Sequence, residues 1–161
     1  MGAVTTVGAF LDGLRAALVV RAGLVGVNVY SGPVSIDDLG VESIILGAPG
    51  DISATYEYNI GTPRDRVDEE YTIPCGIWIV VHGGGETRIK AARDRALALI
   101  DEVHDQLASY TNRVDRSAAI GADRAFITSW DMEQMIGFEG SSARDCRIRF
   151  TITCNASFTP A

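Results

Sequence analysis

Residues 77–101, IWIVVHGGGETRIKAARDRALALID, hold the clearest pattern in the chain. An apolar run stops at His82, three glycines follow, and a charged segment with helical spacing begins at Glu86. Glycine adopts the backbone conformations that a sharp reversal of direction needs, so the three glycines are typical of a turn. The stretch therefore predicts a strand, a turn and a helix, in that order.

The helix is expected to run from Glu86 to Tyr110, because its apolar residues recur three and four positions apart. They are Ile89, Ala92, Ala96, Leu99, Ile100, Val103 and Leu107. Such a helix spans roughly 37 Å, and the apolar run 71–81 spans roughly 36 Å as a strand, so the helix can lie along the sheet. The small residues Ala91, Ala92, Ala96 and Ala98 would allow a close approach.

Periodicity predicts further elements on either side. Apolar residues from Val7 to Leu18 repeat at helical spacing behind the candidate caps Thr5 and Thr6, which predicts a first helix ending near residues 21–23. Alternation and β-branched runs predict strands at 25–30, 42–47, 52–59, 71–81, 124–130 and 146–158. The run 71–81 is apolar on both faces, as a central strand covered on each side would be. Residues 131–145 are interpreted as a connection, and the whole pattern indicates an α/β domain.

Composition limits the function. The 161 residues are 47% hydrophobic, which suits one domain, 1–161, with a sizeable core. A net charge of −7 with scattered cations argues against tight nucleic-acid binding. The odd number of cysteines without a CxxC pair favours buried thiols, with Cys146 and Cys154 on the core face of the last strand. We find neither a signal peptide nor a membrane span, and expect a soluble, intracellular protein.

The HGGG stretch is the one candidate for catalysis. Some esterases use such a loop for an oxyanion hole, but the nucleophile elbow G-x-S-x-G that they require is absent from this sequence. Cys75 and His82 project from opposite faces of one strand, and the two histidines, His82 and His104, lack metal-ligand spacing. We therefore expect no catalytic residue, no metal and no cofactor, and interpret the glycines as a turn.

Two surface segments are candidate interfaces. The first is a long hairpin loop at 60–70 with charges of both signs, whose candidate contact residues are Arg64, Asp65, Arg66, Asp68, Glu69 and Glu70. The second begins at the end of the strand at 124–130, continues into the connection after it, and carries the apolar residues Trp130, Met132, Met135 and Phe138. Such residues outside regular elements either mark an interface or fold over the core.

One resemblance to a known family rests on the order of elements. The segments GVNVYSGP, ESIILG, RDRVDEEYTIPCGIWIVVHGG and AARDRALALIDEVHDQL follow an N-terminal helix, and DEEYTI and RALAL are the most specific parts. Over residues 5–110 this order resembles the tail terminator and minor tail proteins of long-tailed bacteriophages. The segment after residue 117 matches less clearly.

The resemblance implies a mixed, mostly antiparallel sheet with two helices packed on it. It also implies a hexameric ring that caps the tail tube and joins the neck of the filled head, with extended loops that reach the neighbouring subunit or the tube. The partners would be further copies of the chain, the tail tube protein and a neck or head-completion protein, with DNA passing through unbound. The protein would reside in the virion, and in the host cytoplasm during assembly. A neck or head-closure protein is one alternative, and a small esterase using His82 and Gly83 to Gly85 is another.

Overall fold

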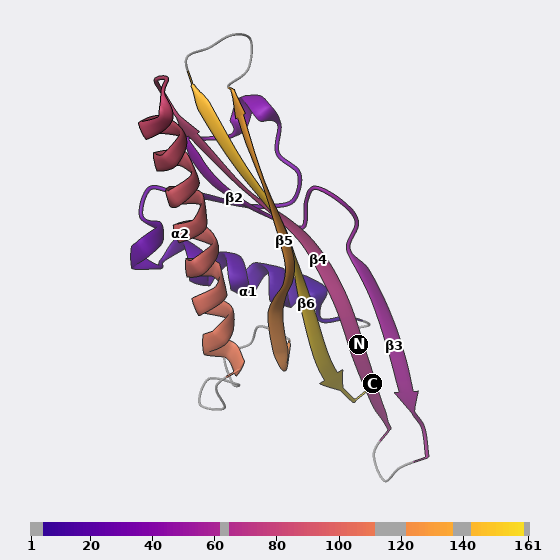
Figure 1. Cartoon of the computed structure of the whole chain (residues 1–161). Coiled ribbons are helices and arrows are strands. Elements are labelled where there is room, and N and C mark those ends of the chain that lie inside the picture. Colours follow the sequence, from indigo (N-terminus) through magenta and orange to yellow (C-terminus); the bar gives the residue numbers. More distant parts are fainter. Residues whose placement is uncertain (1–4, 62–64, 112–121, 137–142, 160–161) are drawn as a thin grey trace.

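The computed structural model describes residues 5–61, 65–111, 122–136 and 143–159 (Figure 1). Within these residues the chain forms two α-helices, two short 3₁₀ helices and six strands. In chain order they are α1 (Val7–Val19), η1 (Ala22–Leu24), β1 (Asn28–Ser31), η2 (Ile36–Asp38), β2 (Glu42–Leu46), β3 (Ser53–Asn59), β4 (Arg66–Val81), α2 (Glu86–Thr111), β5 (Arg124–Ile136) and β6 (Arg144–Phe158). The predicted elements are all present, with shifted ends.

All six strands belong to one sheet. The strand order is β1-β2-β4-β6-β5, with β3 off this path. Strand β3 pairs with residues 66–72 of β4, and β2 pairs with residues 75–79 of the same strand. The pair β1–β2 is parallel, and the other described pairs are antiparallel. The fold is therefore α+β, with a mixed and mostly antiparallel sheet, as predicted.

Both helices contribute to one core on a single face of the sheet. Phe10, Leu14 and Leu18 of α1 and the apolar stripe of α2 from Ala92 to Leu107 are buried against alternate residues of the strands. Ile89, which was expected in this stripe, is exposed. On β4 and β6 these residues are Tyr71, Ile73, Cys75, Ile77, Ile79, Cys146, Ile148, Phe150, Ile152 and Cys154. The three cysteines are free and buried, and burial raises the pKa of Cys75 and of Cys154 to about 12. The predicted core roles of Cys146 and Cys154 are confirmed.

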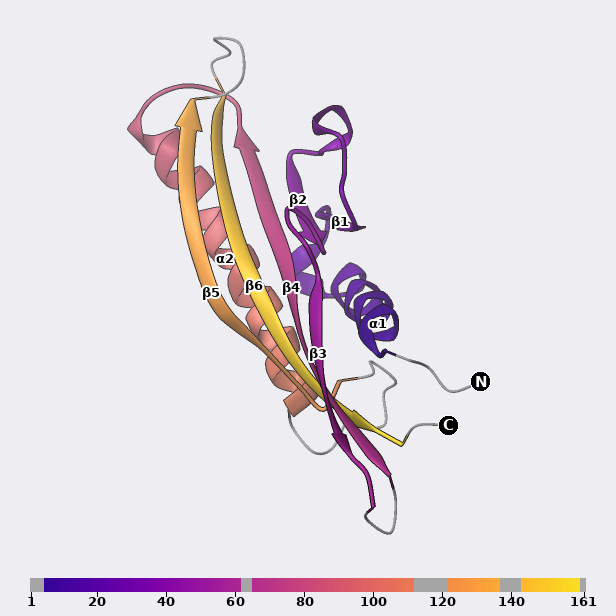
Figure 2. The ribbon, with the colours of Figure 1, turned by 90° about the vertical axis from the view of Figure 1, so that its right-hand side faces the viewer.

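Strand β4 is central, as predicted, but the expectation that both its faces are covered is wrong. Figure 2 shows β5 and β6 in front of α2, with the helix on the far side of the strands. On the other face Trp78 is half-buried, and the Arg147 guanidinium stacks 3.7 Å from the centre of its ring. The Arg147 side chain therefore covers Trp78 on this face, where the apolar pattern of residues 71–81 had suggested a second layer of helices or strands.

The interpretation of residues 131–145 as a connection is also wrong for its first part. Strand β5 continues to Ile136 and pairs with β6 along that length, so Trp130, Met132 and Met135 are strand residues. Phe138 lies outside the described residues. The pairing register shifts between Ile127 and Ser129, which is the signature of a β-bulge. Because a bulge interrupts the two-residue alternation, the strand is difficult to recognise from the pattern alone.

The predicted hairpin loop at 60–70 is shorter in the structure. Strand β4 begins at Arg66, so only residues 60–65 connect β3 to β4. Burial alternates along residues 66–71, with Val67, Glu69 and Tyr71 buried. The dense charge suggested a loop, whereas hydrogen bonds from neighbouring strands hold most of these charges in a sheet.

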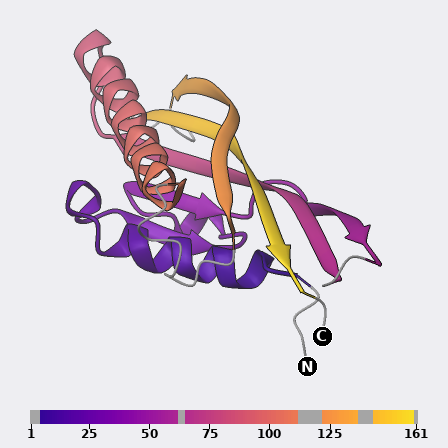
Figure 3. The same ribbon diagram turned by 90° about the horizontal axis from the view of Figure 1, so that it is seen from below.

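The turn between β4 and α2 follows the prediction. Gly83 and Gly85 have φ angles of 104° and 92°, which are unfavourable for residues with a side chain, and Gly84 has no positive φ. No described helix is long and apolar enough to cross a bilayer. The ribbon of β3 and the first part of β4, called the arm from here on, extends away from both helices (Figure 3).

Candidate functional site

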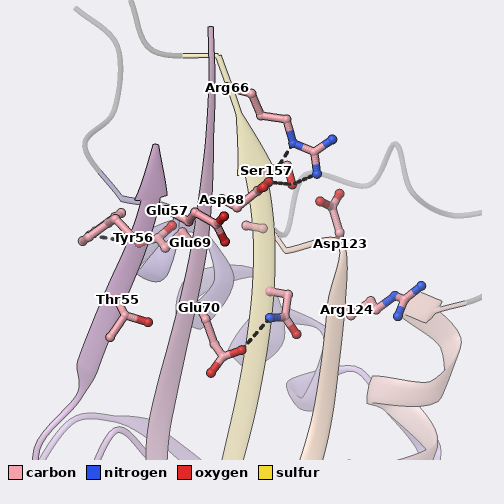
Figure 4. Close-up of a pocket in the computed structure, with 12 residues that line it drawn as sticks. Thr55, Tyr56, Glu57, Arg66, Asp68, Glu69, Glu70, Asp123, Arg124 and Ser157 are labelled. Atoms are coloured by element: carbon pink, nitrogen blue, oxygen red, sulfur yellow. Dashed lines mark hydrogen bonds and ion pairs between the residues drawn. The ribbon is translucent and has the colours of Figure 1, made fainter. Parts of the chain in front are cut away.

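The arm carries most of the predicted contact residues. Residues Ser53 to Tyr58 of β3 are exposed on both faces, although the two-residue alternation along 52–59 is typical of a strand with only one face in water. Along the arm lies an open polar hollow of about 810 Å³ (Figure 4). Its lining residues come from β3, β4 and β6 and from the start of β5: Thr55, Tyr56, Glu57, Arg66, Asp68, Glu69, Glu70, Asp123, Arg124, Asn155, Ala156 and Ser157.

Asp68 is the centre of a hydrogen-bond network in this hollow. Its carboxylate accepts bonds from Ser157 Oγ (2.5 Å), Arg66 Nε (2.7 Å) and Asn59 Nδ2 (3.1 Å). The Ser157 bond, followed by the Arg66 bond, holds the pKa of Asp68 below its usual value. Next to it, Asn155 Nδ2 donates to Glu70 Oε2 at 3.0 Å. These acidic groups are therefore fixed to β6 within the same chain.

Glu69 points to the opposite face and is 1% exposed. Its carboxylate accepts bonds from Thr6 N and Thr6 Oγ1, both at 2.9 Å, from Thr5 Oγ1, and from Tyr56 OH at 3.2 Å. Burial by itself raises the pKa of Glu69, but the bonds from Thr5, Thr6 and Tyr56 outweigh it and lower the pKa below its usual value. The negative charge also lies at the positive N-terminal end of α1, where it is favoured.

Only part of the predicted first interface is therefore available to a partner. Arg66, Asp68, Glu69 and Glu70 all line the hollow, but Glu69 is buried and its carboxylate is bonded to Thr5 and Thr6 of the same chain, so it is not free to contact another subunit. Asp65 is exposed and accepts a bond from Gly61 N at 3.3 Å, and Arg64 lies outside the described residues.

Several residues that line the hollow were not predicted as contact residues from the sequence. Glu57, Asp123 and Arg124 are exposed, and their side chains form no hydrogen bond or ion pair with any described residue. Ser157 and Asn155 extend the polar face of the last strand, and this alternation was the one signal that could have placed them here. No group in the described part of the chain has the composition of a metal site. The hollow is a mixed-charge surface suited to a polar partner.

The second predicted interface lies on edge strand β5. Trp130 is exposed, while Met132 and Met135 are partly buried, and Met132 packs against the core. Both earlier interpretations therefore apply in part, since Met132 covers the core and Trp130 is open to solvent.

The residues of the esterase hypothesis are not brought together. His82 is exposed just beyond β4 and forms no hydrogen bond or ion pair with a described residue. Cys75 is buried in the core, and its raised pKa keeps the thiol protonated at neutral pH. This arrangement provides no activated nucleophile beside His82.

Comparisons with known proteins gave one kind of match. No protein-family model matches the chain, and no curated protein matches it. Among solved structures it is similar to a chain of "Virion of native gene transfer agent (GTA) particle", with a TM-score of 0.46 and 16% sequence identity. The match covers 96% of this chain and 100% of that chain. At this level of similarity the match assigns neither a family nor a function.

Proposed function

We propose that the protein is a structural component of a phage-like virion, a tail terminator that forms a ring, caps the tail tube and joins it to the head or neck. The sequence resemblance over residues 5–110 suggests this role. The observation that carries it is the arm, because both faces of strand β3 are exposed and such a surface is suited to contact another protein.

The exposure of the arm supports an assembly role. Strand β3 lies at an edge of the sheet and pairs with β4 alone among the described strands. Here Tyr58 is 64% exposed and Ile60 is 79% exposed, although both are large apolar side chains. Burial of about 25 cal/mol per Å² of such surface against a neighbour would stabilise both the arm and the assembly.

Charge is consistent with the same role. A chain with a net charge of −7 would form a ring that repels the phosphate backbone, so DNA could pass without binding. The proposed partners are further copies of the chain, the tail tube protein and a neck or head-completion protein. The proposed location is the virion, after assembly in the host cytoplasm, and we assign no catalytic activity or cofactor to the protein.

The test is the mass of the purified protein over a concentration series, followed by electron microscopy of the large species. Rings of six are expected, either from the protein alone or after addition of tail tubes. A protein that remains monomeric in the presence of both tail tubes and filled heads contradicts the proposal. Rings that bind filled heads but not tail tubes would identify a neck or head-closure protein instead.

A further inference from the structure

The start of helix α1 is capped by a residue of a distant strand. Thr6 precedes the helix, but its hydroxyl forms no capping bond to a helical amide, and the first turn has no acidic residue. Its amide and its hydroxyl donate instead to the carboxylate of Glu69 on β4. Val7 N donates to Thr5 Oγ1 at 3.2 Å, and that hydroxyl also donates to Glu69. The arm therefore supplies the negative charge that a capping residue near the helix start would ordinarily supply.

The same carboxylate holds strand β3. Tyr56 lies directly opposite Glu69 in the register of β3 and β4, and its hydroxyl donates to Glu69 Oε1 at 3.2 Å (Figure 4). The ring of Tyr58 lies beside that of Tyr56, with 6.3 Å between the ring centres, but the Tyr58 hydroxyl bonds to no described residue. Glu69 is thus one acceptor shared by two elements, the start of α1 and the edge strand of the arm.

A shared and buried acceptor makes its donors depend on one another. Because Glu69 is buried, each donor that is lost leaves more of its charge uncompensated away from water. A carboxylate that turns towards water to recover this loss also leaves its remaining donors. Loosening of β3 is therefore transmitted to α1, and loosening of α1 is transmitted to β3, with the same coupling free energy in both directions.

We infer that Glu69 is a conformational clasp, through which strand β3 of the arm and the first turn of α1 become ordered together. The inference concerns a single chain and does not rest on the proposed ring function. Any contact that orders β3 would also tighten the first turn of α1, and a change at the start of α1 would loosen the arm.

Hydrogen–deuterium exchange in two conservative variants tests the coupling. Tyr56→Phe and Thr6→Val each remove one hydroxyl that donates to Glu69, and Thr6→Val removes no capping bond within α1. The Phe10 amide reports on the first turn, because it donates to Thr6 O at 3.0 Å. Tyr56→Phe should speed its exchange by about threefold or more, although the change lies on β3. Thr6→Val should likewise speed exchange of the amides of Ser53–Asn59.

Two matched controls lie beside the clasp. Tyr58→Phe makes the same chemical change two residues along β3, where the hydroxyl has no partner among the described residues. Glu70→Gln neutralises the neighbouring exposed carboxylate, which is bonded to Asn155. Both variants should leave exchange of the Phe10 amide unchanged. Thermal unfolding of all variants checks that each chain is folded.

The double variant with Thr6→Val and Tyr56→Phe measures the coupling itself. If both hydroxyls act through one carboxylate, the loss of the first weakens what the second contributes, so their effects are not additive. Exchange of the Phe10 amide should then increase by less than the product of the two single increases. An increase equal to that product would show that the two bonds act independently.

Three results would overturn the clasp. They are changes confined to the mutated element in both single variants, a Tyr58→Phe effect on Phe10 as large as that of Tyr56→Phe, and independent effects in the double variant. All of these measurements use the full chain without tail tubes or heads, so each result leaves the proposed ring function to its own test.

Discussion

At the scale of single residues, Glu69 has the largest structural role among the charged groups of the arm. It is buried, and four hydrogen bonds connect it to Thr5, Thr6 and Tyr56. Glu69→Ala should lower the free energy of unfolding by about 1.5–3 kcal/mol, because the hydrogen bonds to a buried charged acceptor are lost. The control Glu70→Ala removes an exposed carboxylate and should cost less than about 1 kcal/mol in urea unfolding.

The same residue should make stability depend on pH. Because the folded state lowers the pKa of Glu69 below its ordinary value of 4.5, its contribution is present above pH 4.5 and is lost as the pH falls through the lowered value. Wild-type unfolding measured from pH 7 to pH 3 should show this loss. A Glu69→Gln variant should be less stable at pH 7 and show a shallower decline; an unchanged slope would exclude Glu69 as its source.

The glycine turn after β4 gives a second prediction at this scale. Gly83→Ala and Gly85→Ala should each lower stability by about 1–2 kcal/mol, since both positions have positive φ. Gly84→Ala should be nearly neutral, because its Cβ would meet only Arg144 at 3.6 Å. Thermal unfolding of the three variants checks this order, and an equal loss at Gly84 would show that the turn has another constraint.

At the scale of elements, the packing of α2 depends on two of its four predicted small residues. Ala92 and Ala96 are buried against the sheet, whereas Ala91 and Ala98 are exposed. Ala96→Leu should lower the free energy of unfolding by about 1–3 kcal/mol through overpacking. Ala98→Leu adds the same group on the exposed side and should change stability by less than about 0.5 kcal/mol in urea unfolding. Similar losses in both variants would contradict the assigned orientation of the helix.

At the scale of the whole molecule, the arm should differ from the core in its dynamics. Strand β3 is exposed on both faces and sits at an edge of the sheet, whereas β4 and β6 support the core. In the monomer, the amides of Ser53–Asn59 should exchange with deuterium faster than those of Cys146–Cys154. Assembly should slow exchange in β3, and unchanged exchange in assembled rings would exclude the arm from the interface.

The amino-acid sequence by itself determined the elements whose pattern repeats over many residues. Alternation along residues 146–158 and the helical spacing of 86–110 predict burial correctly except at Ile89, which is exposed near the start of α2. They do so because one buried face imposes the period of the element on the residue types. The apolar run 71–81 identifies a central strand for a similar reason. The resemblance, and not the periodicity, supplied the mixed sheet with two helices on it.

Only the tertiary structure decided the features that depend on partners distant in sequence. Glu69 and Asp68 are adjacent and both acidic, yet one is buried beneath α1 and the other bonded to Ser157 on the opposite face. The bulge in β5 and the stacking of Arg147 on Trp78 likewise depend on neighbouring strands. A local pattern shows which side of an element is apolar, but it does not show which distant group binds a charged side chain. In the arm, these distant partners decide which charged residues are structural and which are free to bind another protein.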